Sequence, residues 1–220
     1  MDPRPHEEER RMRADAQRNA EKLRAAAAEL FRERGLQAPL KEIARRAGVS
    51  HGTLYNLFGT REALIDEVVA DLAAERLDRA GRQALDHEDA WEGFAYYIET
   101  ICELQVTDPA ISDVVTGRYP DATRLMSVCE RSHATAWRVI ERAQRAGALR
   151  PDFTHADLLF VFGTNALLSR AAKDSAPDAW RRGIAFVLDG LRTEAAHPLP
   201  APPLSEEQLN RVMTNLAGAR

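Results

Sequence analysis

The segment APLKEIARRAGVSHGTLYNLFGTRE, residues 38–62, reads as a helix, a tight turn and a second short helix. Ile43 and Ala47 lie on one face of the first helix at i and i+4, which gives it an apolar stripe. Gly48 follows where the chain must turn sharply, because glycine reaches positive φ without a Cβ clash. Ser50 is a suitable N-cap for the second helix. Helix, glycine turn and capped helix in this order predict a helix-turn-helix unit.

The second helix has a core face and an outward face. Leu54 and Phe58 share the core face at i and i+4. The N-terminal end of such a helix presents free backbone N–H groups and the positive pole of its dipole, which suits phosphates and base edges. The residues that we expect to contact DNA are Ser50, His51, Gly52, Thr53, Tyr55 and Asn56, with Lys41 from the preceding helix and Arg61 from the following one. An ordinary αα-hairpin with a solvated second helix is the alternative.

Residue chemistry suggests how these contacts divide. Gly52 would allow the helix to approach DNA closely. His51 and Thr53 would contact base edges, Thr53 through a thymine methyl. Tyr55 and Arg61 would each bind a phosphate.

The residues around this unit resemble the N-terminal domain of TetR-type transcriptional regulators (the TetR/AcrR family). The resemblance covers Asn19 to Leu64, about a quarter of the chain, and its motifs are Leu30-Phe31 with Gly35, the run from Ile43 to Phe58, and Arg61-Glu62-Ala63-Leu64. It implies an all-α protein. The N-terminal part would be a three-helix helix-turn-helix DNA-binding domain, and the C-terminal part a helical ligand-binding and dimerisation domain.

The distribution of charge agrees with a DNA-binding end. From Arg10 to Arg61 there are 12 Arg or Lys against 5 Asp or Glu, a net charge of +7. The whole chain has 30 basic and 34 acidic side chains, so the remainder is acidic. A basic end on an acidic body is expected when one domain neutralises phosphates and the other does not. Solvated arginines on an ordinary first helix are the alternative explanation.

Cysteine usage and hydropathy set further bounds. Cys102 and Cys129 have no ligand-spaced partners, so we expect neither a disulfide framework nor a metal site, and we expect no cofactor. No apolar run approaches the ~20 residues that span a bilayer. The N-terminus, MDPRPHEEERRMR, lacks the apolar region of a secretory signal. The expected location is the cytoplasm, with no membrane partner.

Nearly the whole chain reads as helix, with no alternating β-pattern of useful length. The first 14 residues are charged and contain two prolines, which predicts a mobile arm ahead of a helix that starts near Arg18. Ser205 and Gln208 form a capping-box pattern for a final helix. The expected parts are an arm at 1–14, a DNA-binding domain at 15–60, an effector-binding and dimerisation domain at 61–193, a proline-rich linker at 194–204 and a C-terminal helix at 205–220.

Aromatic residues gather in the C-terminal part of the chain. Cys129, His133 and Trp137, at i, i+4 and i+8, are expected on one side of a long helix. Because TetR-like proteins hold an effector among these helices, the resemblance implies a mostly apolar pocket. Its expected lining is Trp91, Phe94, Tyr97, Ile98, Cys129, His133 and Trp137. Plain core packing is the alternative, and a metal at Cys129 and His133 is a third option for which no third ligand is indicated.

The resemblance places dimerisation at two helices, 154–173 and 177–193, which would pair with their copies as a four-helix bundle. The first is apolar nearly all round, which a monomer could not leave partly facing water. The expected interface is Leu159, Phe162, Gly163, Ala166, Leu167, Ile184, Val187, Leu188 and Leu191. A buried central helix in a monomer is the alternative.

Together these features predict a homodimeric repressor that binds double-stranded DNA at an inverted-repeat operator. A small apolar or amphipathic effector would release it. A helix-turn-helix regulator that is controlled by a protein partner, or by nothing, stays open. An α-helical enzyme is the weakest alternative, since the sequence contains no phosphate loop, no acidic metal motif and no nucleophile–base pair.

Overall fold

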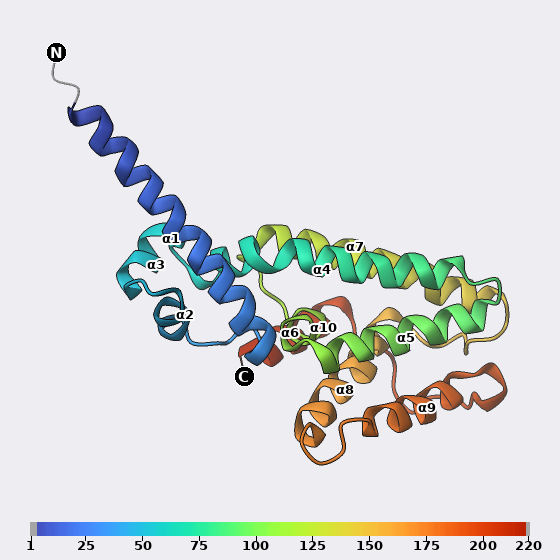
Figure 1. Ribbon diagram of the computed structural model, residues 1–220. Helices are drawn as coiled ribbons and strands as arrows, with labels where there is room; N and C mark the ends of the chain where they lie inside the picture. Colours follow the sequence, from blue (N-terminus) through green and yellow to red (C-terminus); the bar gives the residue numbers. More distant parts are fainter. Residues whose placement is uncertain (1–3, 219–220) are drawn as a thin grey trace.

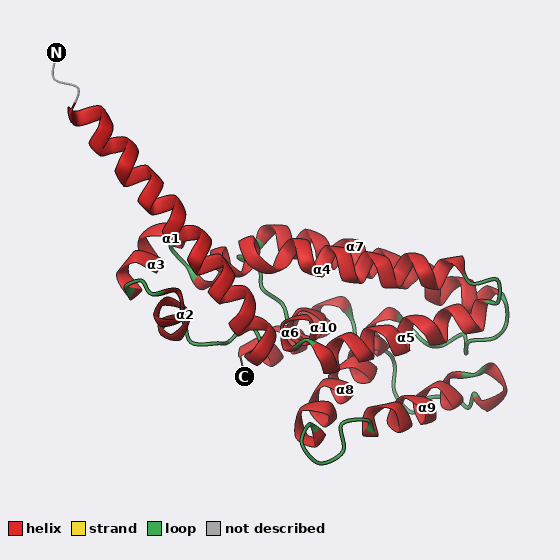
Figure 2. Ribbon diagram, viewed as in Figure 1, coloured by secondary structure: helices red, strands yellow, loops and turns green. Residues whose placement is uncertain are grey.

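The computed structural model describes residues 4–218, and all the regular elements in that range are helices (Figures 1 and 2). The all-α prediction is confirmed. The α-helices are α1 (Arg4–Arg34), α2 (Leu40–Ala47), α3 (His51–Phe58), α4 (Arg61–Asp86), α5 (Ala90–Thr107), α6 (Pro109–Thr116), α7 (Thr123–Arg145), α8 (Leu158–Ala172), α9 (Ala179–Leu191) and α10 (Glu206–Gly218). Two short 3-10 turns, η1 (His155–Asp157) and η2 (Thr193–Ala195), lie before α8 and after α9.

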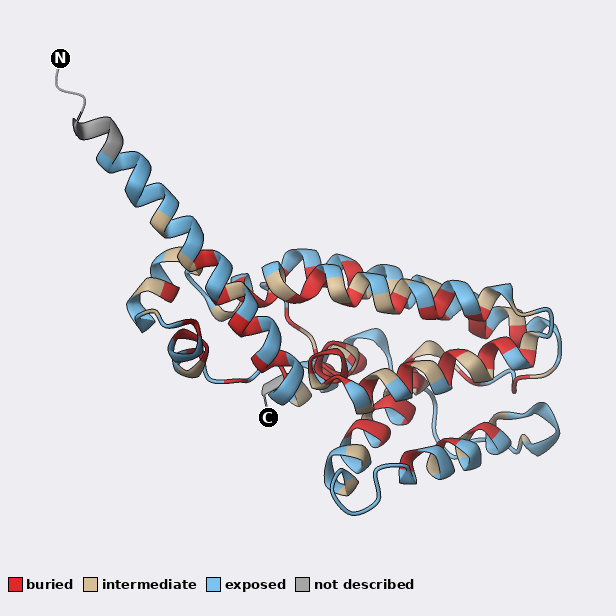
Figure 3. Cartoon of the chain, viewed as in Figure 1, coloured by how far each residue is buried: buried red, intermediate tan, exposed pale blue. Residues whose placement is uncertain are grey.

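Helix α1 begins earlier than the sequence suggested. It starts at Arg4 rather than near Arg18, so residues 4–14 belong to the helix and are not a separate arm. Pro5 falls in the first turn, where a missing N–H loses no hydrogen bond, and an ion pair joins Arg13 to Glu9 one turn away. Residues 8–14 of α1 project from the body and are exposed (Figure 3). Residues 1–3 lie outside the described part of the chain.

The turns and caps of the helix-turn-helix unit form as predicted. Gly48 ends α2 with φ of 68°. The Ser50 side chain accepts a hydrogen bond of 3.0 Å from the backbone N–H of Thr53 and caps α3. Thr60 caps α4 in the same way, by accepting from the N–H of Ala63 at 3.0 Å. Because three helix ends are fixed by side chains and glycine, the geometry of this unit follows from its local sequence.

The long helices α4 and α7 pack side by side and form one wall of the C-terminal domain (Figure 1). A close approach of the two backbones needs a glycine. A Cβ at Gly81 of α4 would lie 2.3 Å from the Cγ2 of Thr135 of α7. Helix α5 lies against both of them, and α8 and α9 cover its other side.

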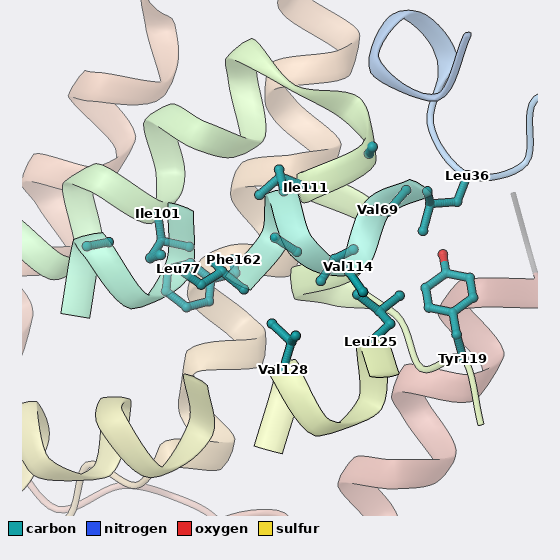
Figure 4. Close-up of a cluster of buried hydrophobic side chains, with 14 of the residues drawn as sticks. Leu36, Val69, Leu77, Ile101, Ile111, Val114, Tyr119, Leu125, Val128 and Phe162 are labelled. Atoms are coloured by element: carbon teal, nitrogen blue, oxygen red, sulfur yellow. The ribbon is translucent and has the colours of Figure 1, made fainter. Parts of the chain in front are cut away.

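Helix α6 is the centre of the molecule. Its Ile111 and Val114 lie in a cluster with Leu36 from the end of α1, Leu125 from α7 and Phe162 from α8 (Figure 4). A helix that is buried on all sides connects every element around it. For this reason the DNA-binding end and the C-terminal helices share one continuous core.

A buried carboxylate, Asp108, helps to fix α6 in place. Asp108 accepts hydrogen bonds from the N–H groups of Ala110 and Ile111 at 3.0 and 3.3 Å and caps the helix. Its second oxygen accepts from Nη1 of Arg76 on α4 at 2.9 Å. The Arg76 pair compensates the charge of Asp108, which is 1% exposed.

Helix α10 packs apart from the main core. Leu209 and Met213 form a separate small cluster with Ala156 of η1, and Leu204 covers its edge. The predicted capping box is present: the N–H of Ser205 donates to Oε1 of Gln208 at 2.9 Å, and the N–H of Gln208 donates to Oγ of Ser205 at 3.3 Å.

Candidate DNA-binding surface and effector cavity

The outward face of α3 is the surface that the sequence predicted for DNA contact. Leu54 is fully buried under α3, whereas Ser50, His51, Gly52 and Asn56 are exposed. Tyr55 is 45% exposed and Thr53 is half-buried. The structure therefore brings these six residues to one end and one side of a short helix.

The fold itself does not require a glycine at position 52. A Cβ at this position would meet nothing nearer than Oγ of Ser50, at 3.7 Å, and the backbone of Gly52 is ordinary α-helix. Glycine in a helix is less stable than alanine by ~0.5–1 kcal/mol. The fold would accept alanine at position 52. The glycine therefore leaves space for a binding partner at this exposed end of α3.

Two side-chain pairs order this end of α3. The hydroxyls of Ser50 and Thr53 lie 2.8 Å apart. The rings of His51 and Tyr55 meet edge to face, with centroids 4.8 Å apart. These pairs reduce the freedom of the side chains before any partner binds.

The basic residues nearby divide into paired and outward groups. Nη1 and Nη2 of Arg46 donate to Glu33 at 2.9 and 3.1 Å, and this pairing raises the pKa of Arg46 and lowers that of Glu33. Lys41 is exposed, and with Arg45 and His51 it borders a shallow depression between α2 and α3. Lys41 is thus placed where a phosphate could reach it.

Arg61 has a different role from the predicted phosphate contact. Its Nη1 donates to the carbonyl oxygens of Leu36 and Ala38, at 2.9 and 2.7 Å. The side chain points back under the loop between α1 and α2, because the planar guanidinium can satisfy two carbonyls that no helix pairs. We therefore assign Arg61 to holding α4 against this loop.

A small cavity lies among the C-terminal helices. Its volume is about 60 Å³, far below the ~300 Å³ at which ligand pockets begin. Tyr97, Cys129 and His133 line it, as predicted. The other lining residues are Ile101, Val114, Val115, Ser132, Ala136, His155, Leu158, Leu159, Phe162, Leu209 and Met213. The space has room for a few water molecules rather than for a drug-sized ligand.

Four of the residues predicted to line the pocket, Trp91, Phe94, Ile98 and Trp137, do not line this cavity. Phe94 and Ile98 are fully buried in the core, and the Phe94 ring packs on Trp91 and Phe153 at 5.6 and 5.8 Å. Trp91 lies under the guanidinium of Arg192, 4.2 Å from the ring centroid. Helix α5 is buried on more than one side, so its apolar pattern did not show which side faces the cavity.

Trp137 is also outside the cavity. It is 48% exposed and stacks on His155, with ring centroids 5.0 Å apart. At 3.6 residues per turn, eight residues leave Trp137 rotated by about 80° from Cys129, which carries it past the cavity.

The sequence did not predict that residues of η1 and α10 line the cavity. His155 reaches the cavity from η1, and Leu209 and Met213 reach it from α10. The capping box predicted a helix at 205–216, but nothing local showed where that helix docks.

Burial changes the acidity of the cavity groups. It raises the pKa of Tyr97 to about 12, against the opposing effect of a hydrogen bond with Ser132, and raises that of Cys129 to about 11. Surrounding protein lowers the pKa of His133, although the residue is partly exposed, and repulsion from His155 and Arg118 lowers it further. Glu130 opposes them. Near neutral pH these shifts favour the uncharged forms of Tyr97, Cys129 and His133.

The predicted dimer face needs a partial correction. Phe162, Ala166, Ile184 and Leu188 are already buried within one chain, and Leu159 packs beside the α10 cluster. The apolar side chains that point outward from α8 and α9 are Phe160, Leu167, Leu168 and Phe186. Gly163, Val187 and Leu191 stay at the surface between them, partly exposed.

Between residues 4 and 218, no helix combines the length and the hydropathy that crossing a bilayer requires. In the same part of the chain, His, Cys, Asp and Glu side chains form no group of three that could hold a metal ion.

Two family models match this chain. Residues 23–68 match the model described as bacterial regulatory proteins, tetR family. Residues 89–193 match the model described as the C-terminal domain of SbtR-like transcriptional regulators. The chain belongs to the TetR family.

Curated relatives match only part of this chain. The uncharacterized HTH-type transcriptional regulator YvdT of Bacillus subtilis is 35% identical over 72 residues, 32% of this chain and 37% of that protein. An HTH-type transcriptional repressor of Mycobacterium tuberculosis is 32% identical over 99 residues, 37% of this chain and 53% of that protein. The matches thus span between about a third and a half of these relatives.

The whole TetR-type architecture recurs in solved structures. The transcriptional regulator FadR of Bacillus subtilis, in complex with stearoyl-CoA, aligns with a TM-score of 0.57 at 16% identity, over 81% of this chain and 100% of that chain. At that identity the similarity concerns the fold alone. As a TetR-family member, the chain is a DNA-binding transcriptional regulator and not an enzyme.

Proposed function

We propose that this regulator is a repressor that binds an inverted-repeat operator as a homodimer and leaves it when a small effector binds. The observation that carries the proposal is the exposed N-terminal end of α3, where a sterically unneeded glycine stands between His51 and Thr53. One curated relative is named a repressor, which supports that direction of control.

The α3 residues divide the work on DNA. Gly52 admits the helix close to the major groove, and His51 contacts a base edge. The Thr53 hydroxyl is paired with Ser50, so its contact uses the methyl group and suits a thymine methyl. Tyr55, Asn56 and Lys41 contact the phosphate backbone of the DNA. Such contacts position the protein on the duplex and do not read its sequence.

The dimer forms through the outward face of α8 and α9. A groove of about 650 Å³ runs between these helices, lined by Phe160, Leu168, Gly183 and Val187 among others. Phe186 is 63% exposed and Leu167 is 70% exposed on the same side. Exposed apolar area of this kind is buried in an isologous contact, where the same patch of each copy meets its partner. Two copies then present two α3 helices, which requires an inverted repeat.

Effector control requires the cavity to open. The FadR structure holds stearoyl-CoA on the same fold, which supports a ligand among these helices. The cavity of about 60 Å³ is too small in the present conformation. This small volume favours a second candidate, a regulator that needs no effector, and ligand-induced release from the operator separates the two.

Helix α6 offers a route from the cavity to the DNA-binding end. Val114 and Val115 of α6 line the cavity, Asp113 of α6 accepts from the N–H of Leu36, and Arg76 joins Asp108 to α4. A shift of α6 therefore moves both α1 and α4. Typical coupling free energies of ~1–3 kcal/mol are enough to change affinity 5- to 150-fold.

Selection from randomised duplex DNA tests the proposal. The purified protein should enrich one inverted repeat whose half-sites are spaced by whole helical turns. His51→Ala should weaken binding to the selected repeat by ~1–3 kcal/mol and leave non-specific binding unchanged. Enrichment of no sequence, or of a single half-site, contradicts the dimeric operator. Because its proposed target is an operator on DNA, we expect the protein to act in the cytoplasm.

A further inference from the structure

We propose that α10 is a displaceable wall of the effector cavity, and that the effector is an uncharged molecule with an apolar body and one hydrogen-bond donor. The inference rests on the proposed function and specifies how its ligand enters. Helix α10 lies beyond residue 193, where the match to the family's C-terminal domain ends.

The first observation is that α10 closes the cavity with two side chains. Leu209 and Met213 line it directly, opposite Cys129 and His133 of α7. They are buried, whereas Val212 on the other side of α10 is 37% exposed. Without these two side chains the cavity loses one wall.

The second observation concerns the contacts that hold the described part of α10 on the body. Leu209 and Met213 belong to a small cluster with Ala156 and not to the main core. Arg118 adds a hydrogen bond to Asn210. The capping box of Ser205 and Gln208 and the ion pair of Glu207 with Arg211 lie within the helix, so they stabilise α10 without attaching it to the body.

The third observation concerns the tether. Nη2 of Arg150 donates to the carbonyl of His197 at 2.7 Å, which fixes the start of the linker. The four prolines of residues 197–203 stiffen the exposed segment that follows. Because this linker is stiff and its start is fixed, α10 can leave the cavity and return to the same position.

The lining specifies the ligand. Among the described residues that line the cavity, none is Lys, Arg, Asp or Glu, so a charged ligand would lose its hydration without compensation. Nδ1 of His155 is buried at this cavity without a hydrogen-bond partner among the described residues. With the ring proton on Nε2, the unpaired Nδ1 accepts a hydrogen bond from the ligand, which favours an N–H or O–H on an otherwise apolar molecule.

N-phenyl-1-naphthylamine serves as the probe, because it is uncharged, apolar and has one N–H. Its binding to the full chain is followed by fluorescence, and hydrogen–deuterium exchange is measured in parallel. Saturating probe should raise amide exchange in the 205–218 peptide at least about tenfold, because a 13-residue helix without tertiary contacts is marginal in water. The α7 peptide around Cys129 should become protected. Probe bound with unchanged or slower exchange in 205–218 overturns the proposal.

A pair of variants provides the control. Leu209→Ala with Met213→Ala weakens docking of α10 and should tighten probe binding about tenfold, because the open state is more populated. Both substitutions favour helix, so α10 still forms. Val212→Ala on the exposed side should leave binding as in the wild type. Absence of probe binding to the double variant also overturns the proposal.

The alkylation rate of Cys129 by N-ethylmaleimide gives a second readout, with Cys102 fully buried as the internal reference. The double variant should react faster at Cys129 and not at Cys102. If the probe opens α10 but leaves operator binding unchanged, the displaceable wall stands and effector control of DNA binding fails.

Discussion

The backbone N–H of Leu36 donates a hydrogen bond of 2.8 Å to Oδ2 of Asp113, which lies 77 residues further along the chain. The bond joins the end of α1 to the middle of α6. Gly35 makes room for it, because a Cβ there would lie 2.3 Å from the same oxygen, and its φ of 82° suits glycine. The two domains of this regulator thus meet at a buried polar contact with little steric tolerance.

Asp113→Ala should destabilise the protein by about 1–3 kcal/mol, since it leaves the buried N–H of Leu36 without this acceptor. Urea unfolding measures the change. Asp113→Asn keeps an acceptor of nearly the same shape and should lose less. Equal stability of the two variants would show that the bond to Leu36 contributes nothing.

Gly52→Ala should leave the fold intact and raise helix stability by ~0.5–1 kcal/mol, because a Cβ there meets only Oγ of Ser50, at an ordinary contact distance of 3.7 Å. Operator binding should fall at least about tenfold, as the added methyl separates α3 from the groove. Thermal unfolding measures the change in stability, and a DNA mobility assay measures the change in operator affinity. A variant that binds as well as the wild type would place the DNA contact elsewhere.

Arg61→Ala should lower stability by about 1–3 kcal/mol, because the carbonyls of Leu36 and Ala38 lose their shared donor. The salt dependence of DNA binding should keep its slope. Lys41→Ala is the matched control: it should leave stability unchanged and reduce the slope by about one unit, as expected for a lost phosphate contact. The reverse pattern would restore Arg61 as a phosphate ligand.

Leu167→Glu should yield a folded monomer, because it places an unpaired charge in the dry centre of the proposed dimer face at a penalty of about 3–5 kcal/mol. Light scattering should give about 49 kDa for the wild type, twice the chain mass of 24.5 kDa, and half of that for the variant. Leu167→Met controls for the loss of the native side chain. Phe162 is unsuitable for this test because it is buried within one chain. A monomeric wild type at micromolar concentration would refute the dimer.

His133 should titrate below its ordinary pKa of 6.5, since desolvation and repulsion from His155 and Arg118 disfavour its protonation. The unfolded chain then binds the proton more tightly. The stability that neutral His133 contributes is therefore fully present above the unfolded pKa and is lost as pH falls from there toward the folded pKa. The effect is small because the ring is partly exposed. NMR titration checks the direction: Arg118→Gln should raise the pKa of His133 and Glu130→Gln should lower it.

Local sequence was a good guide wherever the structure is local. Gly48 ends α2, Ser50 caps α3 and the Ser205–Gln208 box starts α10, all as predicted. Caps and tight turns involve residues within a few positions of each other, so their geometry is determined without the rest of the fold. The predicted start of α1 was wrong because Pro5 falls in the first turn, where a proline does not interrupt the helix.

The sequence by itself determined the helix-turn-helix, the all-α class and the outward residues of α3, since each depends on spacing along one helix. Tertiary structure alone decided which side of α5 faces the cavity, that Trp137 lies outside it, and that Arg61 binds the α1–α2 loop. It also brought Leu209 and Met213 of α10 to the same cavity as Cys129 of α7. Helical periodicity shows which residues share a face, but which neighbour covers that face depends on packing between segments far apart in the chain.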